Sequence, residues 1–130
     1  MPRKSRFISV EISIKTDHEC AAFVEWFQSQ GNYVDKLPCE THRWYAYFAP
    51  LPCSNADATI RHLCEGISDW PDNVRRQWNA AGIREFFVGY EIGSEPVAYL
   101  DHFSETTLKM AAEIGAGIGL ALYPPAIFKK

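Results

Sequence analysis

The sequence predicts an α+β protein: a two-layer sandwich in which a mostly antiparallel sheet of about five strands carries helices on one face. Segments with strand-like alternation and segments with helical periodicity follow one another in the order strand, helix, strand, two helices, strand, strand, helix, strand. The chain has 130 residues, of which 47% are hydrophobic, and this composition suits one core. We therefore expect a single domain over residues 1–130 with a short basic arm at 1–6. The expected topology is a ferredoxin-like split βαβ arrangement elaborated by a helix pair at 54–81.

The first half of the chain is expected to contain two strands with a helix between them. Residues 7–15 (FISVEISIK) alternate between apolar and polar side chains, which indicates a half-buried strand. Thr16 and Glu19 have the spacing of a capping box, which predicts a helix that begins at Thr16. Residues 32–42 are interpreted as a loop or ragged edge, and 43–51 (RWYAYFAPL) as a second strand rich in aromatic residues.

A pair of helices is expected between residues 52 and 82. Ser54 is expected to cap the first of them. Asp69 is the expected N-cap of the second helix, with Pro71 in its first turn, where the missing N–H is harmless. Trp78 belongs to the apolar stripe of this second helix, and we expect it to be buried.

Two further strands and a last helix complete the predicted elements. Residues 83–92 and 97–102 alternate like strands and flank a GSEP turn, which predicts a β-hairpin. Ser104 is expected to cap the last helix. The apolar side of that helix consists of Leu108, Ala111 and Ala112.

The glycine-rich stretch at 111–125 (AAEIGAGIGLALYPP) is interpreted as the end of this helix followed by a strand. Gly115 stands where a left-handed C-terminal cap is expected. Phosphate-binding glycine loops have the opposite order, because the phosphate sits at the N-terminus of the helix that follows the loop. We therefore expect no nucleotide here. Gly117 and Gly119 fall on the same side of the strand, which allows another backbone or bulky aromatic side chains to lie close.

The charge distribution argues against nucleic-acid binding. Five of the 13 basic residues lie at the chain ends, so residues 7–128 hold 8 basic and 16 acidic residues, a net charge of −8. A body of this charge repels phosphate. No segment has the composition of a membrane-spanning helix and no secretory signal is recognised, so we expect no membrane partner and a cytoplasmic location. The four cysteines are then expected to be reduced.

The segment from Trp44 to Tyr123 resembles the bacterial domain family of unknown function DUF4279. The resemblance rests on the aromatic start of a strand (RWYAYF), a helix pair and a strand hairpin with a Gly/Pro turn (FFVGYEIGSEP). It continues through a Ser-capped helix and a glycine-bearing final strand (FSETTLKMAAEIGAGIGLALYP). The resemblance implies a small soluble bacterial protein, and it carries over no catalytic residue.

Cysteine and histidine residues support one functional hypothesis, a small enzyme. Cys53 lies near an expected helix start, where the helix dipole lowers the pKa of a thiol, and His42 or His102 would serve as its base. Cys20 and Cys64 lie on apolar helix stripes, so the histidines two positions before them point away. We therefore expect no metal ion and no cofactor.

Aromatic residues support a second and favoured hypothesis, a non-catalytic binding module. Tyr45 and Tyr47 share one side of the second strand, and Phe87 and Glu11 are expected to join them on the helix-free face of the sheet. Together they would form a shallow, acidic, aromatic surface, and such surfaces tend to be contact sites. The expected ligand is a protein partner, a second copy of the chain in a homo-oligomer, or a small molecule. An immunity protein that neutralises a basic toxin is one example.

Overall fold

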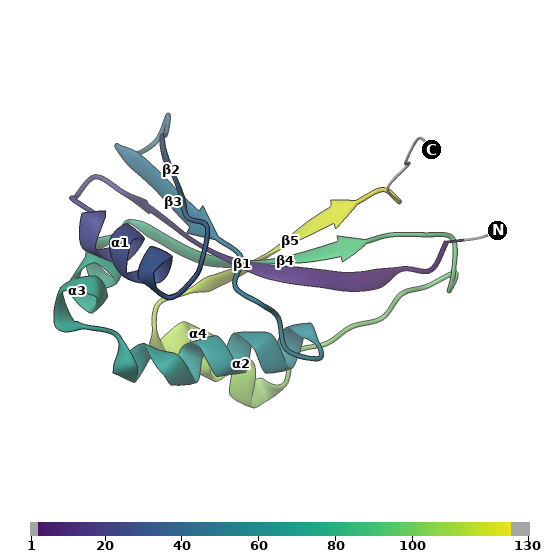
Figure 1. Cartoon of the computed structure of the whole chain (residues 1–130). Helices are drawn as coiled ribbons and strands as arrows, with labels where there is room; N and C mark the ends of the chain where they lie inside the picture. Colours follow the sequence, from purple (N-terminus) through teal and green to yellow (C-terminus); the bar gives the residue numbers. More distant parts are fainter. Residues whose placement is uncertain (1–2, 126–130) are drawn as a thin grey trace.

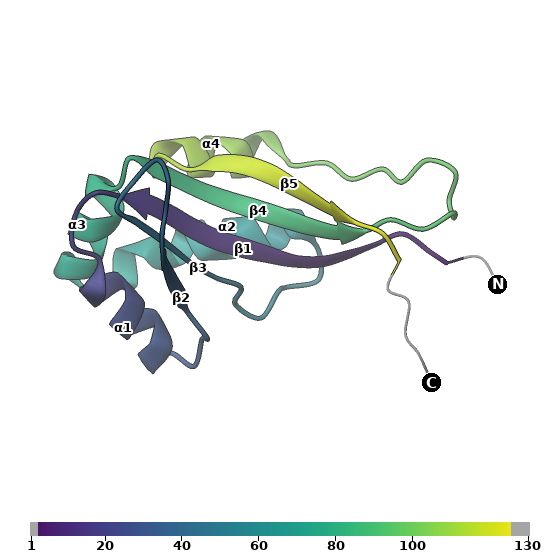
Figure 2. The ribbon, with the colours of Figure 1, turned by 90° about the horizontal axis from the view of Figure 1, so that it is seen from above.

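Residues 3–125, which the computed structural model describes, contain a five-stranded sheet and four α-helices (Figure 1). The strands are β1 (Arg6–Thr16), β2 (Asp35–Pro38), β3 (Trp44–Phe48), β4 (Ile83–Glu91) and β5 (Gly117–Tyr123). The helices are α1 (Ala21–Ser29), α2 (Ala56–Gly66), α3 (Asp72–Ala80) and α4 (Glu105–Glu113), with a 3₁₀ turn, Ile67–Asp69, after α2. The helices lie on one face of the sheet, so the predicted two-layer α+β fold is confirmed (Figures 1 and 2). The structure describes the predicted basic arm from Arg3 onward. Arg6, the last residue of that arm, is already the first residue of β1.

The sheet has the strand order β2-β3-β1-β4-β5, with β1 in the middle. β1 pairs antiparallel with both β3 and β4, so β3 and β4 run parallel to each other on either side of it. The α2–α3 pair connects β3 to β4 and gives the split βαβ unit that the sequence predicts. The two edges are β2 and β5. β2 lies within the segment interpreted as a loop or ragged edge, and β5 pairs parallel with β4 after a crossover through α4.

The predicted β-hairpin between residues 83–92 and 97–102 is wrong. Residues 97–102 form an irregular segment on the helix side, and β5 occupies the position beside β4 (Figure 1). The GSEP turn instead bonds to the segment before β1. The Glu95 N–H donates to the Arg3 carbonyl (3.1 Å), and the Ser5 N–H donates to the Glu95 carbonyl (2.7 Å). The backbone N–H and carbonyl of Glu95 are therefore satisfied by the residues just before β1.

The core lies between the helices and one face of the sheet. Ile12 and Ile14 of β1 are fully buried there, because alternate residues of a strand point to the same side. Trp78 of α3 is fully buried as well, and its ring stacks on Phe23 of α1 with the centroids 6.4 Å apart. The Trp78 indole N–H donates to the Ile114 carbonyl at 2.9 Å. Trp78 therefore links α3 to α1 and to the end of α4.

Helix α1 begins later than the capping-box pattern predicts. Thr16 is the last residue of β1, and its side-chain oxygen accepts a hydrogen bond from the His18 N–H (3.1 Å). The Glu19 carboxylate accepts from the N–H groups of Cys20 and Ala21, both at 2.8 Å. A short turn separates the strand from the helix, and the threonine closes that turn. The Gln77 side-chain oxygen accepts the Phe23 N–H at 2.8 Å, so Glu19 and Gln77 share the first free N–H groups of the helix.

The N-caps of α2 and α3 also lie beyond the predicted ones, Ser54 and Asp69. Asn55 caps α2, and its side-chain oxygen accepts a backbone N–H of the first turn (2.8 Å). Asp69 lies in the 3₁₀ turn, and α3 begins only after Pro71. Between them Trp70 is buried in the core, so the chain must turn inward before α3 starts.

The structure confirms that the glycine-rich stretch is the end of a helix followed by a strand. Ser104 caps α4, and its hydroxyl accepts the Thr107 N–H at 3.1 Å. Gly115 has a φ of +77°, the left-handed conformation that favours glycine, and it ends the helix. The residues after it form β5, so the stretch is a helix end and a strand and not a phosphate loop.

Of the three residues predicted for the apolar side of α4, only Ala111 is buried. Leu108 and Ala112 are exposed, whereas Thr107 is fully buried and Ala111 nearly so. The Thr107 hydroxyl can lie in the core because it is hydrogen-bonded to the Ser104 hydroxyl (2.9 Å). Apolarity alone predicts the burial of Ala111 but not that of Thr107, because a polar side chain with a hydrogen-bond partner takes a core position.

Candidate binding groove on the open sheet face

The four residues predicted to form a contact surface lie on the helix-free face of the sheet. Glu11 of β1 is opposite Phe87 of β4 in the antiparallel register. Tyr47 and Tyr45 of β3 are opposite the β1 residues two and four positions after Glu11, which point to the same side as Glu11. All four side chains are partly exposed. The structure therefore brings them together on one accessible face.

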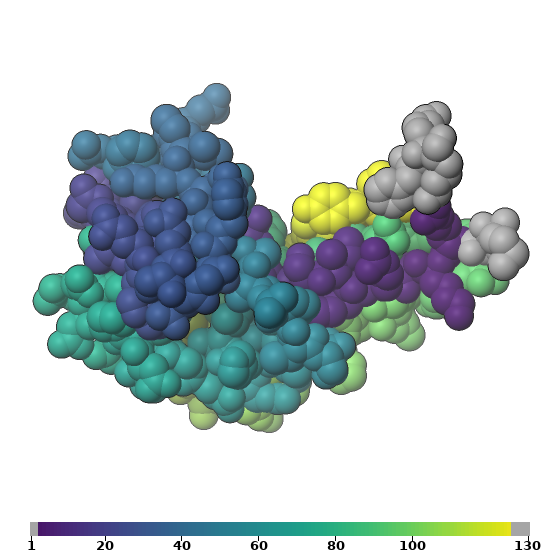
Figure 3. All heavy atoms as spheres, in the orientation of Figure 1, coloured from purple at the N-terminus to yellow at the C-terminus, as the bar shows by residue number. Residues whose placement is uncertain are grey.

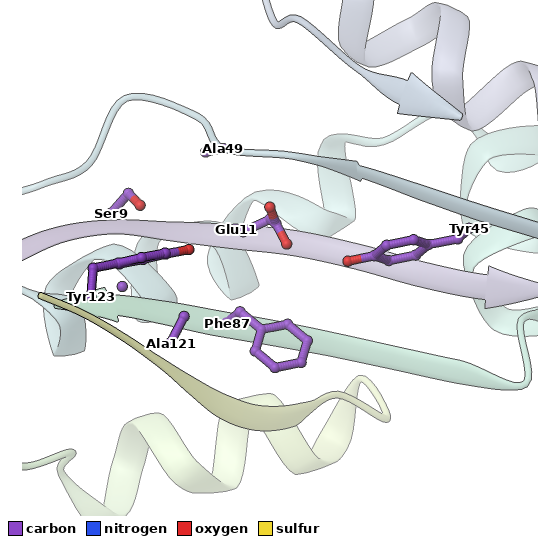
Figure 4. A pocket seen from close by; sticks show the side chains of 8 residues that line it. Ser9, Glu11, Tyr45, Ala49, Phe87, Ala121 and Tyr123 are labelled. Atoms are coloured by element: carbon purple, nitrogen blue, oxygen red, sulfur yellow. The ribbon is translucent and has the colours of Figure 1, made fainter. Parts of the chain in front are cut away.

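This face contains a groove with a volume of about 190 Å³ (Figure 4). The molecule is visibly hollowed between the β2–β3 side and β5 (Figure 3). Tyr47 lies outside the lining of the groove, but its ring stacks on the Tyr45 ring with the centroids 4.7 Å apart and so supports it. The lining residues are Ser9, Glu11, Tyr45, Ala49, Phe87, Gly89, Ala121 and Tyr123.

Small residues on β4 and β5 leave room for the groove. A Cβ atom at Gly89 would lie 3.3 Å from the Ser9 hydroxyl oxygen and 3.6 Å from the ring of Tyr123. A Cβ atom at Gly119 would lie 2.4 Å from Cε1 of Phe87, closer than two carbon atoms approach, so the Phe87 ring occupies the space above Gly119. The close approach of an aromatic side chain to a glycine of the final strand is therefore confirmed.

Glu11 is a partly buried carboxylate to which the described residues offer no ion pair. Burial raises the pKa of Glu11 above its ordinary value; a hydrogen bond from the Tyr45 hydroxyl opposes this rise, and the charge of Asp35 adds to it. Figure 4 shows the Tyr45 hydroxyl pointing toward the Glu11 carboxylate. The carboxylate has therefore lost part of its hydration and gained one hydrogen bond in exchange.

The tyrosine hydroxyls beside Glu11 stay protonated at neutral pH. Burial, followed by the charge of Glu11, raises the pKa of Tyr45 to about 12. Burial and the charge of Asp35 also raise the pKa of Tyr47. Tyr45 therefore acts as a hydrogen-bond donor toward Glu11.

Carboxylates outnumber cations on the open face of the five strands. Arg6 forms an ion pair with Glu91 at one end of the face (3.1 Å). The Lys15 ammonium lies 5.5 Å from the centroid of the Tyr45 ring. The strand register places these charged residues on the face: Asp35, Glu11, Glu85, Glu91, Arg6 and Lys15. The excess of negative charge therefore lies along the middle of the sheet, beside the groove.

The sequence pattern alone does not reveal Tyr123 as a groove residue. In Figure 4 it stands at the end of the groove away from Tyr45. The alternation of GIGLALY places Tyr123 on the same side as Gly117 and Gly119, which is a usable signal. The wrongly predicted hairpin, however, puts another strand beside β4, where the register in fact places β5.

Cys53, His42 and His102 lie in three separate loops. The Cys53 N–H donates to the Thr59 hydroxyl (3.0 Å), just before α2. His42 lies in the turn between β2 and β3, where its Nδ1 is 3.0 Å from Oγ1 of Thr41. His102 precedes α4. Within residues 3–125, no hydrogen bond joins Cys53 to either histidine, so the hypothesis of a thiol with a histidine base gains no support from the hydrogen bonds.

Asp101, the sequence neighbour of His102, bonds away from the imidazole. Its Oδ2 accepts the Tyr90 hydroxyl at 2.5 Å, and its Oδ1 accepts the backbone N–H of His102 at 2.9 Å. Burial and this carboxylate raise the pKa of Tyr90. Asp101 therefore ties the segment before α4 to β4 and does not orient a catalytic histidine.

The cysteine whose pKa is lowered is Cys39, in the β2–β3 turn. The main cause is its hydrogen bond with the Thr41 hydroxyl (3.4 Å between Sγ and Oγ1), and the backbone N–H groups of Thr41 and His42 contribute. Burial has the opposite effect on Cys64, whose pKa it raises to about 11. The sequence favours Cys53 over Cys39 because a helix follows Cys53. The turn after Cys39, however, supplies N–H groups of its own.

All four cysteines are free thiols. The described part of the chain contains no group of three or more His, Cys, Asp or Glu side chains placed to hold a metal ion. None of the helices within residues 3–125 combines the length and the apolarity that crossing a membrane requires.

Comparison with known proteins adds no assignment. The chain matches no protein-family model, no curated protein and no solved structure. The resemblance to DUF4279 therefore stays a prediction, and a function has to be inferred from the groove.

Proposed function

We propose that this protein is a non-catalytic binding module that holds a partner protein with a basic surface against the open face of its sheet. The observation that carries the proposal is the groove beside Glu11, which is accessible, walled by aromatic rings and flanked by carboxylates. Partly exposed tyrosine rings are favoured contact groups between proteins, because they bury a large area and lose little conformational freedom. An acidic face favours a partner of opposite charge.

The size of the groove favours a side chain of a protein over a separate small molecule. Its volume of about 190 Å³ is smaller than the ~300–1,000 Å³ typical of sites for drug-sized ligands. The stacked rings of Tyr45 and Tyr47 extend the aromatic surface along β3, outside the groove. This extension suits a partner that lies across several strands.

The charge of the face also argues against contact with a second copy through the same face. A contact between two copies through this face would bring Glu11 and Glu85 of one chain close to the same carboxylates of the other chain, which is unfavourable. A basic protein has no such penalty, and a toxin neutralised by an immunity protein is a partner of this kind. A reducing compartment such as the cytoplasm fits the proposal, because Cys53 is an exposed free thiol.

Site-specific photocrosslinking in cells that produce the protein tests the proposal. We expect p-benzoylphenylalanine in place of Tyr47 to form an adduct with one defined protein of basic isoelectric point, because this ring is partly exposed beside the groove. The same probe in place of Leu108, which is 49% exposed on α4, is the matched control. The control is expected to give no adduct with that protein.

Three outcomes would contradict the proposal. An adduct between two copies of the chain would replace the basic partner by self-association. The same adducts from positions 47 and 108 would show contact without preference for the open face. No adduct at all from position 47 would argue that this face does not hold a protein.

A further inference from the structure

We infer that the groove beside Glu11 receives the cationic end of a single lysine or arginine side chain from the partner protein. The inference rests on the proposed function and names the chemistry by which the open face would recognise its partner. It combines three features of the groove: a carboxylate with no ion pair to the residues at 3–125, aromatic rings in the lining and a small volume.

The Glu11 carboxylate provides the charge. It is partly buried, accepts a hydrogen bond from Tyr45 and has no ion pair within residues 3–125. A carboxylate has about four acceptor positions on its two oxygens, so one donor from Tyr45 leaves positions for a ligand. A bound ammonium or guanidinium group would replace the water that burial has removed from Glu11.

The aromatic rings provide a second attraction for a cation. A cation within about 6 Å of a ring centroid is attracted by the negative face of the ring. Lys15 already lies near the Tyr45 ring, at 5.5 Å from its centroid, which shows that this face accommodates such a contact. The rings left for a ligand are those of Phe87 and Tyr123, which line the groove beside Glu11 (Figure 4).

The shape of the groove distinguishes an organic cation from a metal ion. Gly89 and Ala121 leave a shallow space of about 190 Å³, which suits the end of one long side chain. Calcium and magnesium need about six oxygen ligands and commonly more than one carboxylate. The lining of the groove supplies one carboxylate, Glu11, and one such group satisfies a single ammonium or guanidinium.

Peptide titration followed by NMR of the ¹⁵N-labelled chain tests the inference. The probe is acetyl-Gly-Gly-Arg-Gly-Gly-amide, with the lysine peptide in parallel and a citrulline peptide as the neutral control of the same shape. We expect the arginine peptide to shift the backbone amide signals around Glu11 and Phe87, with a dissociation constant of roughly 1 mM for so small a contact. The citrulline peptide is expected to bind at least about tenfold more weakly.

Two variants that remove one negative charge each make the test specific. Glu11→Gln is expected to weaken binding of the arginine peptide at least about tenfold, because it removes the charged acceptor. Glu113→Gln removes an exposed carboxylate at the end of α4 and is expected to leave binding unchanged. The dispersion of the amide signals shows whether each variant is folded, so loss of binding is separated from loss of structure.

The outcomes separate this inference from the proposed function. The cation site would be overturned if the citrulline peptide bound as tightly as the arginine peptide. It would also be overturned if Glu11→Gln and Glu113→Gln changed the affinity for the arginine peptide equally. No shifts with either cationic peptide, together with a basic protein crosslinked at position 47, would overturn the cation site and leave the binding module standing. Peptide binding at Glu11 without any crosslinked protein would contradict the proposed function and leave a site for a free organic cation.

Discussion

The ring of Phe87 on β4 lies over Gly119 on the neighbouring strand β5. The two residues are paired in the parallel register, and a Cβ atom at position 119 would lie 2.4 Å from Cε1 of Phe87. The ring can adopt this position only because residue 119 has no side chain. A glycine on the edge strand therefore determines where one wall of the groove stands.

Substitution of this glycine is expected to destabilise the fold. Gly119→Ala should lower the free energy of unfolding by about 1–3 kcal/mol, because the Phe87 ring has to leave its place. Urea denaturation followed by fluorescence measures the change. Gly117→Ala is the matched control on the same strand, since its Cβ atom would meet no atom closer than 3.9 Å. Equal effects of the two substitutions would show that the Phe87 ring does not depend on Gly119.

The hydrogen bond from Trp78 to Ile114 leads to a second stability prediction. Trp78→Phe keeps an aromatic ring but removes the indole N–H, so the partly buried hydrogen bond to the Ile114 carbonyl is lost and we expect a loss of about 1–3 kcal/mol in the free energy of unfolding. Trp26→Phe is the control, because Trp26 is only partly buried. Urea denaturation of both variants checks the prediction. A loss in Trp26→Phe as large as that in Trp78→Phe would mean that ring size, and not the bond to Ile114, is responsible.

Elements that depend on neighbouring residues could be predicted from the sequence. The alternation in residues 7–15 predicts β1, Ser104 marks the start of α4, and Gly115 marks its end. The same parity placed Tyr45 and Glu11 on the helix-free face, because the direction of a side chain along a strand follows from position alone. Local rules sufficed wherever the controlling groups lie within one element.

Features that depend on strand partners could not be predicted in this way. The residues after the GSEP turn alternate like a strand, but their place beside β4 is taken by β5, which comes about 20 residues later in the chain. Which segment pairs with β4 depends on packing across the whole sheet. For this reason the sequence does not predict Tyr123 as a groove residue. It also does not predict that Glu11 has no ion pair within residues 3–125, because that depends on three strands together.

The raised pKa of Glu11 predicts how the stability of Glu11→Gln changes with pH. The folded state holds the Glu11 proton more tightly than the unfolded state, so this group stabilises the fold at acid pH and loses that contribution as the pH rises through the interval from about 4.3 up to the raised pKa. Tyr45, Asp35 and Tyr123 face this carboxylate from the other strands, and Lys15 lies on its own strand. Glutamine has no such proton. The stability of Glu11→Gln relative to the natural chain should therefore increase between pH 4 and pH 7.

Urea denaturation at several pH values measures this difference. Glu113→Gln is the control, because it removes one carboxylate that is exposed at the end of α4 and lies outside the lining of the groove. A relative stability of Glu11→Gln that falls as the pH rises would mean that the Glu11 carboxylate is stabilised in the folded protein. That result would also remove the argument for an unpaired charge in the groove.

The β2–β3 turn predicts selective reactivity of Cys39 toward iodoacetamide. Its hydrogen bond with Thr41 lowers the pKa of Cys39, so at pH 7 more of this thiol is thiolate than in an ordinary cysteine. In a variant that retains only Cys39, labelling should be faster than that of a free cysteine peptide, and Thr41→Val should slow it because the main cause of the lowered pKa is removed. Thr106→Val, at an exposed position on α4, is the control and should have no effect. In the natural chain, Cys64 should react with iodoacetamide only in denaturant, because burial raises its pKa to about 11 and excludes the reagent. A Cys39 rate equal to that of the peptide, or unchanged by Thr41→Val, would show that the turn does not stabilise the thiolate.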